Sequence, residues 1–583
     1  MVLAGAWLGL SPGCAQWHAR QADEAADRTI ASANKAALGT TRPFDVNYRP
    51  FSPSGERVQA ASGLEASDPN ARTIKVGEKV ISLGPDTPQK LTPPETLEIA
   101  FRNSRSFQDK AEALFSQALA VASGRRSWNY PLLGGTITAE ASHTKVNEGH
   151  EDNVATAAPA VSLTQRFLSG GVLTAGYALE VLSDFTGASN TTVGSLLEAN
   201  FTQPLLRGAW RGIAYEDQYR RERDLLLAVF EYERFRQTFA ADIITQYYRL
   251  LQQQDQLTNQ ERSIHRLERT LAQTRVLADG GQVSPIQRDQ AEQNLLNAMI
   301  RLEQVRQNYR NQLDQFKITL GLPVAANVEG DYPAALELLV QKGLEALNLA
   351  EDQAVQVAMS ARPDVLSQRA GLRDAARDVE IAADAFLPEL NLELGISAPG
   401  TQPRRFYRTR FNDHTRSASV SFEYDLDQTD NRDAYRNSIL DLEKAKRDYT
   451  EFLDRVVLEV RQSYRELAQS RRSHELQVRN VEVAWRRWTL ADLQQKEGRA
   501  TARDVLEAED ALREAQNGLT AAAVAYVTTR LTFLTNLGLI EVDEKGVFHE
   551  RDKPFGFEKI QRHYPYLGEV SKPRLDAAWR PSR

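Results

Sequence analysis

The sequence predicts an α+β protein built as a tandem repeat, in which each copy joins a few strands to a long antiparallel helical hairpin. Three observations support this fold class. Residues 224–322 align without a gap to residues 441–539, and the two segments share far more residues than chance would give. Shared apolar positions recur at heptad spacing in both copies. Runs of alternating apolar and polar residues precede each hairpin.

The composition excludes several classes of protein. The 583 residues carry 71 Lys and Arg against 78 Asp and Glu, a net charge of −7, which gives no electrostatic case for nucleic-acid binding. The single cysteine excludes an internal disulfide and a CxxC metal or redox site. No apolar run reaches 18 residues, so no transmembrane helix is predicted. Without a phosphate-binding glycine loop or an HExxH motif, we expect no enzyme, cofactor or metal site.

Residues 1–14 resemble a bacterial lipoprotein-type signal. A short apolar run ends in small residues just before Cys14, which would be the lipidated residue. No basic residue precedes the run, and Pro12 is unusual at its position, so an ordinary apolar start with a stray cysteine is the alternative. Scattered Pro, Gly, Ser and charges after it predict an extended N-terminal segment over 15–90.

Each copy begins with a helical pattern, over 94–122 and over 349–385, followed by strands. The predicted strands cover 134–143, 172–183 and 193–203 in the first copy and 389–397 and 417–426 in the second. An added β-hairpin around 157–191, turning near 169–171, accounts for the greater length of the first copy. Ten-residue runs of alternating hydrophobicity between polar loops are typical of a membrane β-barrel segment.

The helical hairpins are predicted by what their long segments lack. Residues 211–275 contain no Pro and one Gly, and residues 431–497 contain neither Pro nor Gly, so each segment is predicted to form a helix of roughly 100 Å. Ser284 and Thr501 are the expected N-caps of the returning helices, with Pro285 at the first helical position. Periodicity alone leaves a free-standing coiled-coil spacer as an alternative.

The order of these elements resembles the TolC-type outer-membrane efflux proteins, over roughly residues 91–539. Four stretches resemble the family's opening helix, its two strand–helix steps and its inter-helix tip: PETLEIA at 94–100, TQPLLRG at 202–208, FLP at 386–388 and GRATARDVLEAE at 498–509. The resemblance implies a TolC-like homotrimer, with a shared outer-membrane β-barrel continued by a long periplasmic α-helical barrel. The family usually contributes four strands per protomer. The added segment either widens the barrel or forms an extracellular extension.

The same resemblance divides the chain into domains. Residues 91–323 form the first efflux-protein repeat, 324–348 an equatorial linker, 349–540 the second repeat and 541–583 a C-terminal tail.

The implied function is the exit duct of a tripartite efflux or type I secretion system, which passively conducts small molecules or proteins. The implied partners are a periplasmic adaptor protein, an inner-membrane pump and outer-membrane lipid, and the implied location is the outer membrane. A periplasmic coiled-coil adaptor or a structural scaffold is the rival interpretation. An adaptor, however, would carry one hairpin beside a lipoyl-like domain rather than two hairpins each preceded by strands.

The resemblance also implies site residues. The adaptor-contacting tips would be Gly281, Gln282, Val283 and Ser284 in the first hairpin, and Gly498, Arg499, Ala500 and Thr501 in the second. Alternatively, the tip glycines only permit the turns. The entrance gate would use Asp504 and Glu507, which share one helix face and would give six carboxylates in a trimer. The plainer reading is that both acids only favour the dipole of the helix that begins there.

Overall fold

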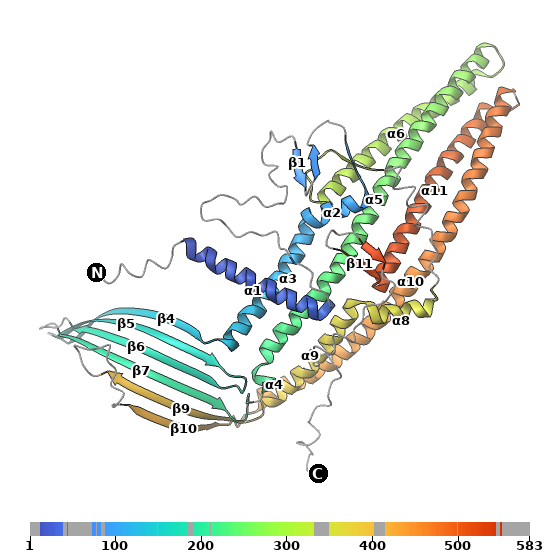
Figure 1. The fold of residues 1–583 in the computed structure, drawn as a ribbon. Coiled ribbons are helices and arrows are strands. Elements are labelled where there is room, and N and C mark those ends of the chain that lie inside the picture. The colour runs from blue at the N-terminus through green and yellow to red at the C-terminus, as the bar shows by residue number, and fades with distance from the viewer. Residues whose placement is uncertain are drawn as a thin grey trace, which may run out of the picture.

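The computed structural model describes the backbone of residues 12–38, 44, 73–76, 79–82, 88–147, 150–184, 190–209, 211–331, 349–400, 414–497, 499–543 and 548–550. Figure 1 shows an elongated molecule with one β-sheet at one end and two long helical hairpins that run to the other end. The duplication is therefore visible in the fold, since each copy contributes strands to the sheet and one hairpin to the rod.

The two hairpins have the predicted form. The first joins α5 (Glu216–Asp279) to α6 (Pro285–Thr319), after the short helix α4 (Arg211–Ala214), and the second joins α10 (Thr429–Lys496) to α11 (Ala502–Leu537). At 1.5 Å per residue, α5 and α10 are each about 100 Å long. Among the described helices, none combines the length and the hydropathy needed to cross a bilayer.

The heptad seam is buried in both copies, as predicted. The buried positions in α6 and α11 correspond to one another: Ala291, Ala298 and Phe316 in the first copy, and Ala508, Ala515 and Phe533 in the second. Along the seam, Ala alternates with Leu near the tip, and Tyr and Phe follow toward the middle of the rod, so the partner helix can approach closely at the alanines and packs around rings further along.

Each leading helix is interrupted, so the prediction of single helices over 94–122 and 349–385 is wrong. The first copy has α2 (Pro93–Asn103) and α3 (Arg105–Asn129), and the second has α8 (Glu351–Ala361) and α9 (Pro363–Asp384). The residues between them, Ser104 and Arg362, are extended, with ψ of 127° and 124°. Pro363 disfavours helical backbone at Arg362 in the second copy.

A glycine of the hairpin approaches each interruption. Gly321 and Gly538, which follow α6 and end α11, have φ of +75° and +71°. A Cβ atom at Gly321 would lie 2.1 Å from the Asn103 carbonyl oxygen, and one at Gly538 would lie 3.0 Å from the Ala361 oxygen. Each interruption of the leading helix and the glycine that packs against it form one structural unit, here called the joint. The helix is interrupted at the place where the turn after the hairpin lies against it.

Six antiparallel strands form one sheet in the order β10-β9-β7-β6-β5-β4. The strands are β4 (Leu132–Asn147), β5 (His150–Arg166), β6 (Val172–Asp184), β7 (Asn190–Pro204), β9 (Glu389–Gly400) and β10 (Thr415–Glu423). The predicted extra hairpin is confirmed as β5–β6, whose turn is closed by the Phe167 N–H donating to the Gly171 oxygen over 2.8 Å. The two copies join where β7 pairs with β9.

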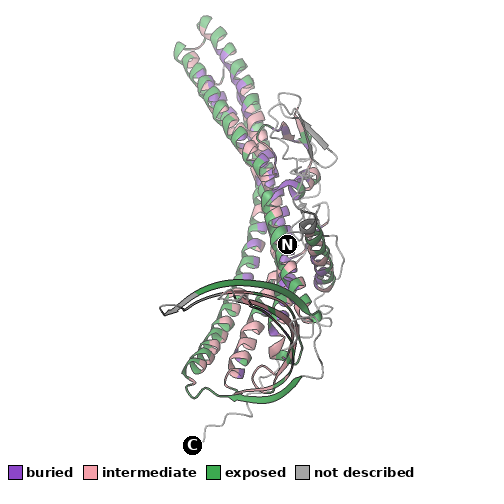
Figure 2. Ribbon diagram, turned by 90° about the vertical axis from the view of Figure 1, so that its left-hand side faces the viewer, coloured by how far each residue is buried: buried purple, intermediate pink, exposed green. Residues whose placement is uncertain are grey.

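The sheet has one apolar and one polar face, because side chains alternate along each strand and paired residues share a face. The apolar face carries Leu133, Ile137, Val161, Leu163, Tyr177, Leu197, Phe201, Leu394, Val420 and Phe422. The polar face carries Thr136, Thr138, Glu140, Ser162, Glu180, Glu198, Asn200, Glu393, Ser419 and Ser421. Figure 2 shows that few residues of this sheet are buried, in contrast to the helices.

The prediction of an extended segment over 15–90 is wrong for its first third. Residues Pro12–Leu38 form the helix α1, and Cys14 lies in its first turn. Ala26, Ile30, Ala33 and Ala37 lie on one face of α1 and are buried against α3 and α5. Most of these anchoring side chains are alanines, so the stripe is too weakly apolar to stand out in the sequence.

Short strands surround the middle of the rod. β3 (Gln89–Leu91) pairs in parallel with β8 (Val328–Gly330), so the segment before the first copy meets the linker after it. A hairpin of β1 (Thr73–Val76) and β2 (Lys79–Ser82) precedes them. At the boundary between the second repeat and the predicted tail, β11 (Ile540–Val542) pairs with β12 (Phe548–Glu550). Residues 332–348 of the predicted linker and 551–583 of the tail lie outside the described residues.

Candidate functional site at the helical tips

The first tip is a tight turn with an exposed apolar rim. Gly281 has φ +70°, and the Gln282 N–H donates to the Leu277 oxygen over 2.8 Å, which satisfies a carbonyl at the end of α5. Ser284 is the predicted N-cap, since its Oγ accepts from the Ile286 N–H over 3.3 Å. Gly281, Gln282 and Ser284 are exposed and Val283 is half-buried, so this tip is open to a partner.

The second tip is capped more strongly. The Thr501 Oγ accepts from the Asp504 N–H, and both the Thr501 N–H and its hydroxyl donate to Asp504 Oδ2, over 2.9 and 2.7 Å. Hydrogen bonds from Thr501 lower the pKa of Asp504, which therefore stays ionised in weak acid. The Arg499 and Ala500 N–H groups both donate to the Gln494 oxygen, and Gly498 lies outside the described residues.

Asp504 and Glu507 lie on one exposed face of α11, as predicted. Glu507 contacts Arg503 on its own helix at 3.2 Å and Arg487 of α10 at 3.8 Å. Asp504 therefore has a structural role as a cap in addition to any role in conduction. The first hairpin carries Gln287 and Gln290 at the equivalent positions, and α6 nonetheless begins with only a serine cap. Acids are therefore not required to start a helix at this point of the repeat.

A buried polar contact joins the two hairpins behind the acidic face, and the sequence reasoning missed it. Arg266 Nε of α5 donates to Glu509 Oε2 of α11 over 2.6 Å, with the two side chains only 13% and 2% exposed. The same guanidinium lies over the Trp488 ring of α10, 5.9 Å from its centroid. The sequence shows Glu509 only as a residue that matches Glu292 in the first copy, and it does not predict a partner for Glu509 on the other hairpin.

The polar contact between the hairpins continues toward the middle of the rod. Thr520 of α11 donates to Asp255 of α5 over 2.5 Å, and Asn259 bridges Asp255 and Asn517 over 3.0 Å each. Hydrogen bonds thus join the two hairpins at more than one level, and they fix the pairing of these faces more specifically than apolar packing would.

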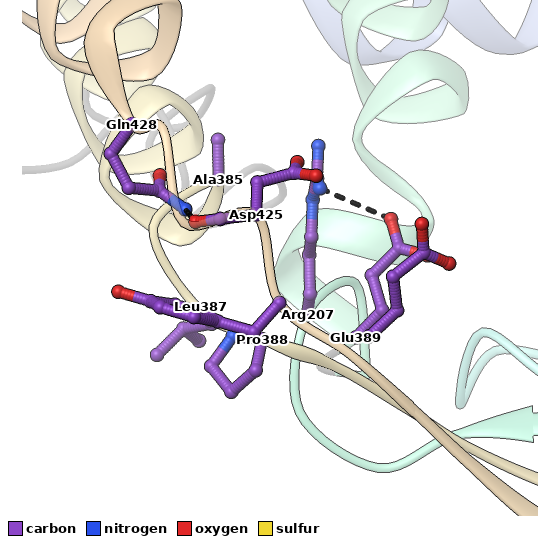
Figure 3. Close-up of a pocket in the computed structure, with 9 residues that line it drawn as sticks. Arg207, Ala385, Leu387, Pro388, Glu389, Asp425 and Gln428 are labelled. Carbon is purple, nitrogen blue, oxygen red and sulfur yellow. Dashed lines mark hydrogen bonds and ion pairs between the residues drawn. The ribbon is translucent and has the colours of Figure 1, made fainter.

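The strand–helix junction brings together the two step motifs found in the sequence. Figure 3 shows the small pocket there, with Arg207 pointing toward Glu389 across the two copies. Their ion pair measures 3.1 Å, and the Gly208 N–H donates to Asp384 Oδ2 over 2.9 Å. These contacts link the sheet to the helices across the two copies.

The architecture defines a class of protein in which a sheet with one apolar face continues into paired helical hairpins of about 100 Å. Residues 354–539 match the sequence profile of the outer membrane efflux protein family. The resemblance to TolC-type outer-membrane efflux proteins is therefore confirmed, and the fold of the chain is TolC-like.

Solved structures share this fold at low sequence identity. The outer membrane protein VceC of Vibrio cholerae matches with a TM-score of 0.58 at 15% identity, covering 76% of this chain and 96% of VceC. The CmeC outer membrane channel of Campylobacter jejuni gives 0.57 at 14%, covering 82% and 89%. The open state of the MtrE outer membrane channel of Neisseria gonorrhoeae gives 0.54 at 12%, covering 76% and 88%. No curated protein sequence matches the chain.

Proposed function

We propose that this protein is the outer-membrane exit duct of a tripartite efflux or type I secretion system, and that it conducts cargo passively rather than catalysing a reaction. The observation that carries the proposal is the continuity of the two-faced sheet with the paired hairpins through the junction of Arg207 and Glu389. The apolar face suits lipid, and the polar face suits a wet lumen. The hairpins are long enough to extend far into the periplasm.

The duct is a homotrimer in this proposal. One chain leaves β4 and β10 as sheet edges, and unpaired backbone groups in lipid cost several kcal/mol each. The hairpins also have open flanks. Leu476, Val483 and Leu490 repeat every seven residues along α10 and are 52–55% exposed, while Leu296 and Ile300 of α6 are 55% and 59% exposed. Contact of α10 with α6 of the next protomer would cover both flanks.

Asp504 and Glu507 form the entrance gate in this proposal. Threefold symmetry would gather six carboxylates at the narrow end, where they would attract and hold multivalent cations. The test is the double variant Asp504→Asn with Glu507→Gln, which keeps the side-chain shapes and the cap. The half-blocking concentration of a multivalent cation should rise by about tenfold, a change of ~1.4 kcal/mol shared by the carboxylates.

A matched control separates the gate from general surface charge. Asp289→Asn removes an exposed acid from the first turns of α6, at the tip of the other hairpin, and should leave block unchanged. Equal effects of the two variants would contradict the assignment of the gate to Asp504 and Glu507.

The exposed tips are the proposed contact with a periplasmic adaptor, which would link the duct to an inner-membrane pump. Val276 and Ile286, which flank the first turn, are 72% and 68% exposed, so a partner can bury apolar surface there. Replacing Gln282 and Ser284 with lysine should abolish adaptor co-purification while trimer formation persists. Retained co-purification would place the adaptor elsewhere.

Cys14 is the proposed lipid-attachment site. Its position in the first turn of α1 would hold the acyl chains at the membrane end of the rod, since α1 packs on α3 and α5. Cys14→Ser should eliminate incorporation of labelled palmitate during expression in a Gram-negative host, and continued labelling would contradict the site.

The decisive experiment measures conduction with all partners absent. The purified full-length chain, added to a planar bilayer, should give discrete, long-lived conductance steps and should migrate as a heat-sensitive trimer on a gel. A protein that remains monomeric and electrically silent would contradict the proposed duct.

A further inference from the structure

The two strands that lengthen the first copy belong to the same sheet as the other four. β5 pairs with β4 over almost its whole length, and β6 pairs with both β5 and β7. Each of the six strands has at least nine residues, the length that a tilted strand needs to cross a bilayer. Apolar residues of β5 and β6, such as Val161 and Tyr177, continue the apolar face of their neighbours.

We propose that β4 and β10 are intersubunit edges, and that three chains close an eighteen-stranded barrel in which β10 of each protomer pairs with β4 of the next. This inference rests on the proposed trimeric duct. The occupant of each edge is a second copy of this chain, because strand direction alternates from β4 to β10. An even number of strands therefore lets β10 meet the next β4 in antiparallel orientation.

The stagger of the sheet supports closure with three copies. A row of paired residues starts at Leu133, the second residue of β4, and reaches Arg416, the second residue of β10, at the end far from the helices. We count residues along each strand from the end that lies next to the helices. The row then climbs, that is, shifts along the strands, by about six residues over the five steps from β4 to β10. Six steps make up one protomer, so the climb is about seven residues per protomer. With a rise of about 3.3 Å and a strand spacing of about 4.8 Å, this corresponds to a tilt of roughly 40°, within the range found in barrels.

Face alternation narrows the register between protomers. The apolar face must stay continuous across the new pair, so the climb per protomer is an even number of residues. Only climbs of about six or eight residues give tilts near 35–45°. These two registers place Thr138 of β4 opposite Ser417 or opposite Ser419 of β10 in the neighbouring protomer. All three side chains lie on the polar face.

Eighteen strands make a wider barrel than the four-per-protomer arrangement would. At the same spacing and tilt, the circle of Cα atoms is about 35 Å across for eighteen strands and about 24 Å for twelve. The cross-sectional area therefore roughly doubles. The additional strands enlarge the outer-membrane exit, while the number of helices that form the entrance at the tips is unchanged.

Cysteine cross-linking in the full-length protein tests the edge. The variants Thr138→Cys/Ser417→Cys and Thr138→Cys/Ser419→Cys should include one that forms covalent trimers on a denaturing, non-reducing gel. The comparison variants Ala178→Cys/Ser417→Cys and Ala178→Cys/Ser419→Cys place the first cysteine on the polar face of β6. They would cross-link only if β4 and β5 lay outside a twelve-stranded barrel, so they should stay monomeric. The parent chain, whose one cysteine is Cys14, controls for unrelated disulfides.

Electron cryo-microscopy of the trimer in nanodiscs provides the second measurement, with a barrel about 35 Å wide expected. A trimer that is cross-linked through Ala178→Cys, or whose barrel is about 24 Å wide, overturns the eighteen-stranded closure but leaves the duct intact. A chain that forms no trimer at all contradicts the proposed function itself, so the two failures are distinguishable.

Discussion

The Arg266–Glu509 contact should hold the second hairpin against the first, and its loss should free the tip. Glu509 is 2% exposed and Arg266 is 13% exposed, so Glu509→Gln leaves a nearly buried cation without its counter-charge. Breaking one side of a buried ion pair costs about 3–5 kcal/mol. The lower end applies here, because Arg266 retains some contact with water and with the Trp488 ring. A loss of about 3 kcal/mol makes the local separation of the two hairpins roughly 150-fold more favourable.

Hydrogen exchange measures this local opening without requiring the trimer to unfold. Amides of α11 around Glu509 should exchange about 100-fold faster in Glu509→Gln, whereas amides near Phe533 should keep their rates. Glu514→Gln, which neutralises an exposed acid on the same helix, is the matched control and should leave exchange unchanged.

A double variant tests the physical reasoning. Replacing both Arg266 and Glu509 with leucine removes the isolated charge and should restore most of the protection, because apolar residues of similar volume can substitute for a buried pair. Unchanged exchange in Glu509→Gln, or equal acceleration in the single and double variants, would show that the ion pair does not hold the hairpins together.

Three further predictions address the joint, the N-terminal helix and the cap. Gly538→Ala should destabilise the protein by about 1–2 kcal/mol or more, because φ is +71° and the Ala361 oxygen is close, whereas Gly371→Ala in the open face of α9 should not lower the thermal midpoint. Ile30→Ala should cost about 2–5 kcal/mol and expose α1 to limited proteolysis, unlike Trp17→Ala at a 56% exposed site. Thr501→Val removes a hydrogen bond that lowers the pKa of Asp504, so cation block should fade at a higher pH on acidification than in the parent, measured as block against pH.

The sign of the pH effect follows from the direction of the shift. Because the folded-state pKa of Asp504 is depressed, its capping bonds are fully present above the ordinary value of 3.8 and are lost as the pH falls through the lowered pKa. The long helices and the N-caps of the returning helices were predictable from the sequence, because both depend on interactions between neighbouring residues. Ser284 and Thr501 act through hydrogen bonds to nearby residues, and Pro285 acts through its fixed φ, so sequence spacing reveals all three directly.

The features that the sequence did not reveal depend on contacts between distant segments. The interruption at Ser104 has no proline beside it and coincides with the close approach of Gly321, more than two hundred residues away. The sheet membership of β5 and β6 required knowing which strands pair, because periodicity gives faces but not neighbours. The role of Glu509 was hidden for the same reason. Its counterpart Glu292 pairs within its own hairpin, with Arg275 at 3.3 Å, whereas Glu509 reaches across to the other hairpin.

This divergence between the copies has a consequence for assembly. α11 packs on both α10 and α5, so the order of helices across one chain is α6-α5-α11-α10, and α6 and α10 are the open flanks. In Figure 1, α6 lies on the side of the molecule that carries β4, and α10 on the side that carries β10. The unpaired strands of the sheet and the open helices of the rod therefore lie on the same two sides of the protomer. A rotation that brings β10 to the next β4 also brings the exposed Val483 row of α10 toward Ile300 of the next α6, so one symmetry operation satisfies both ends of the molecule.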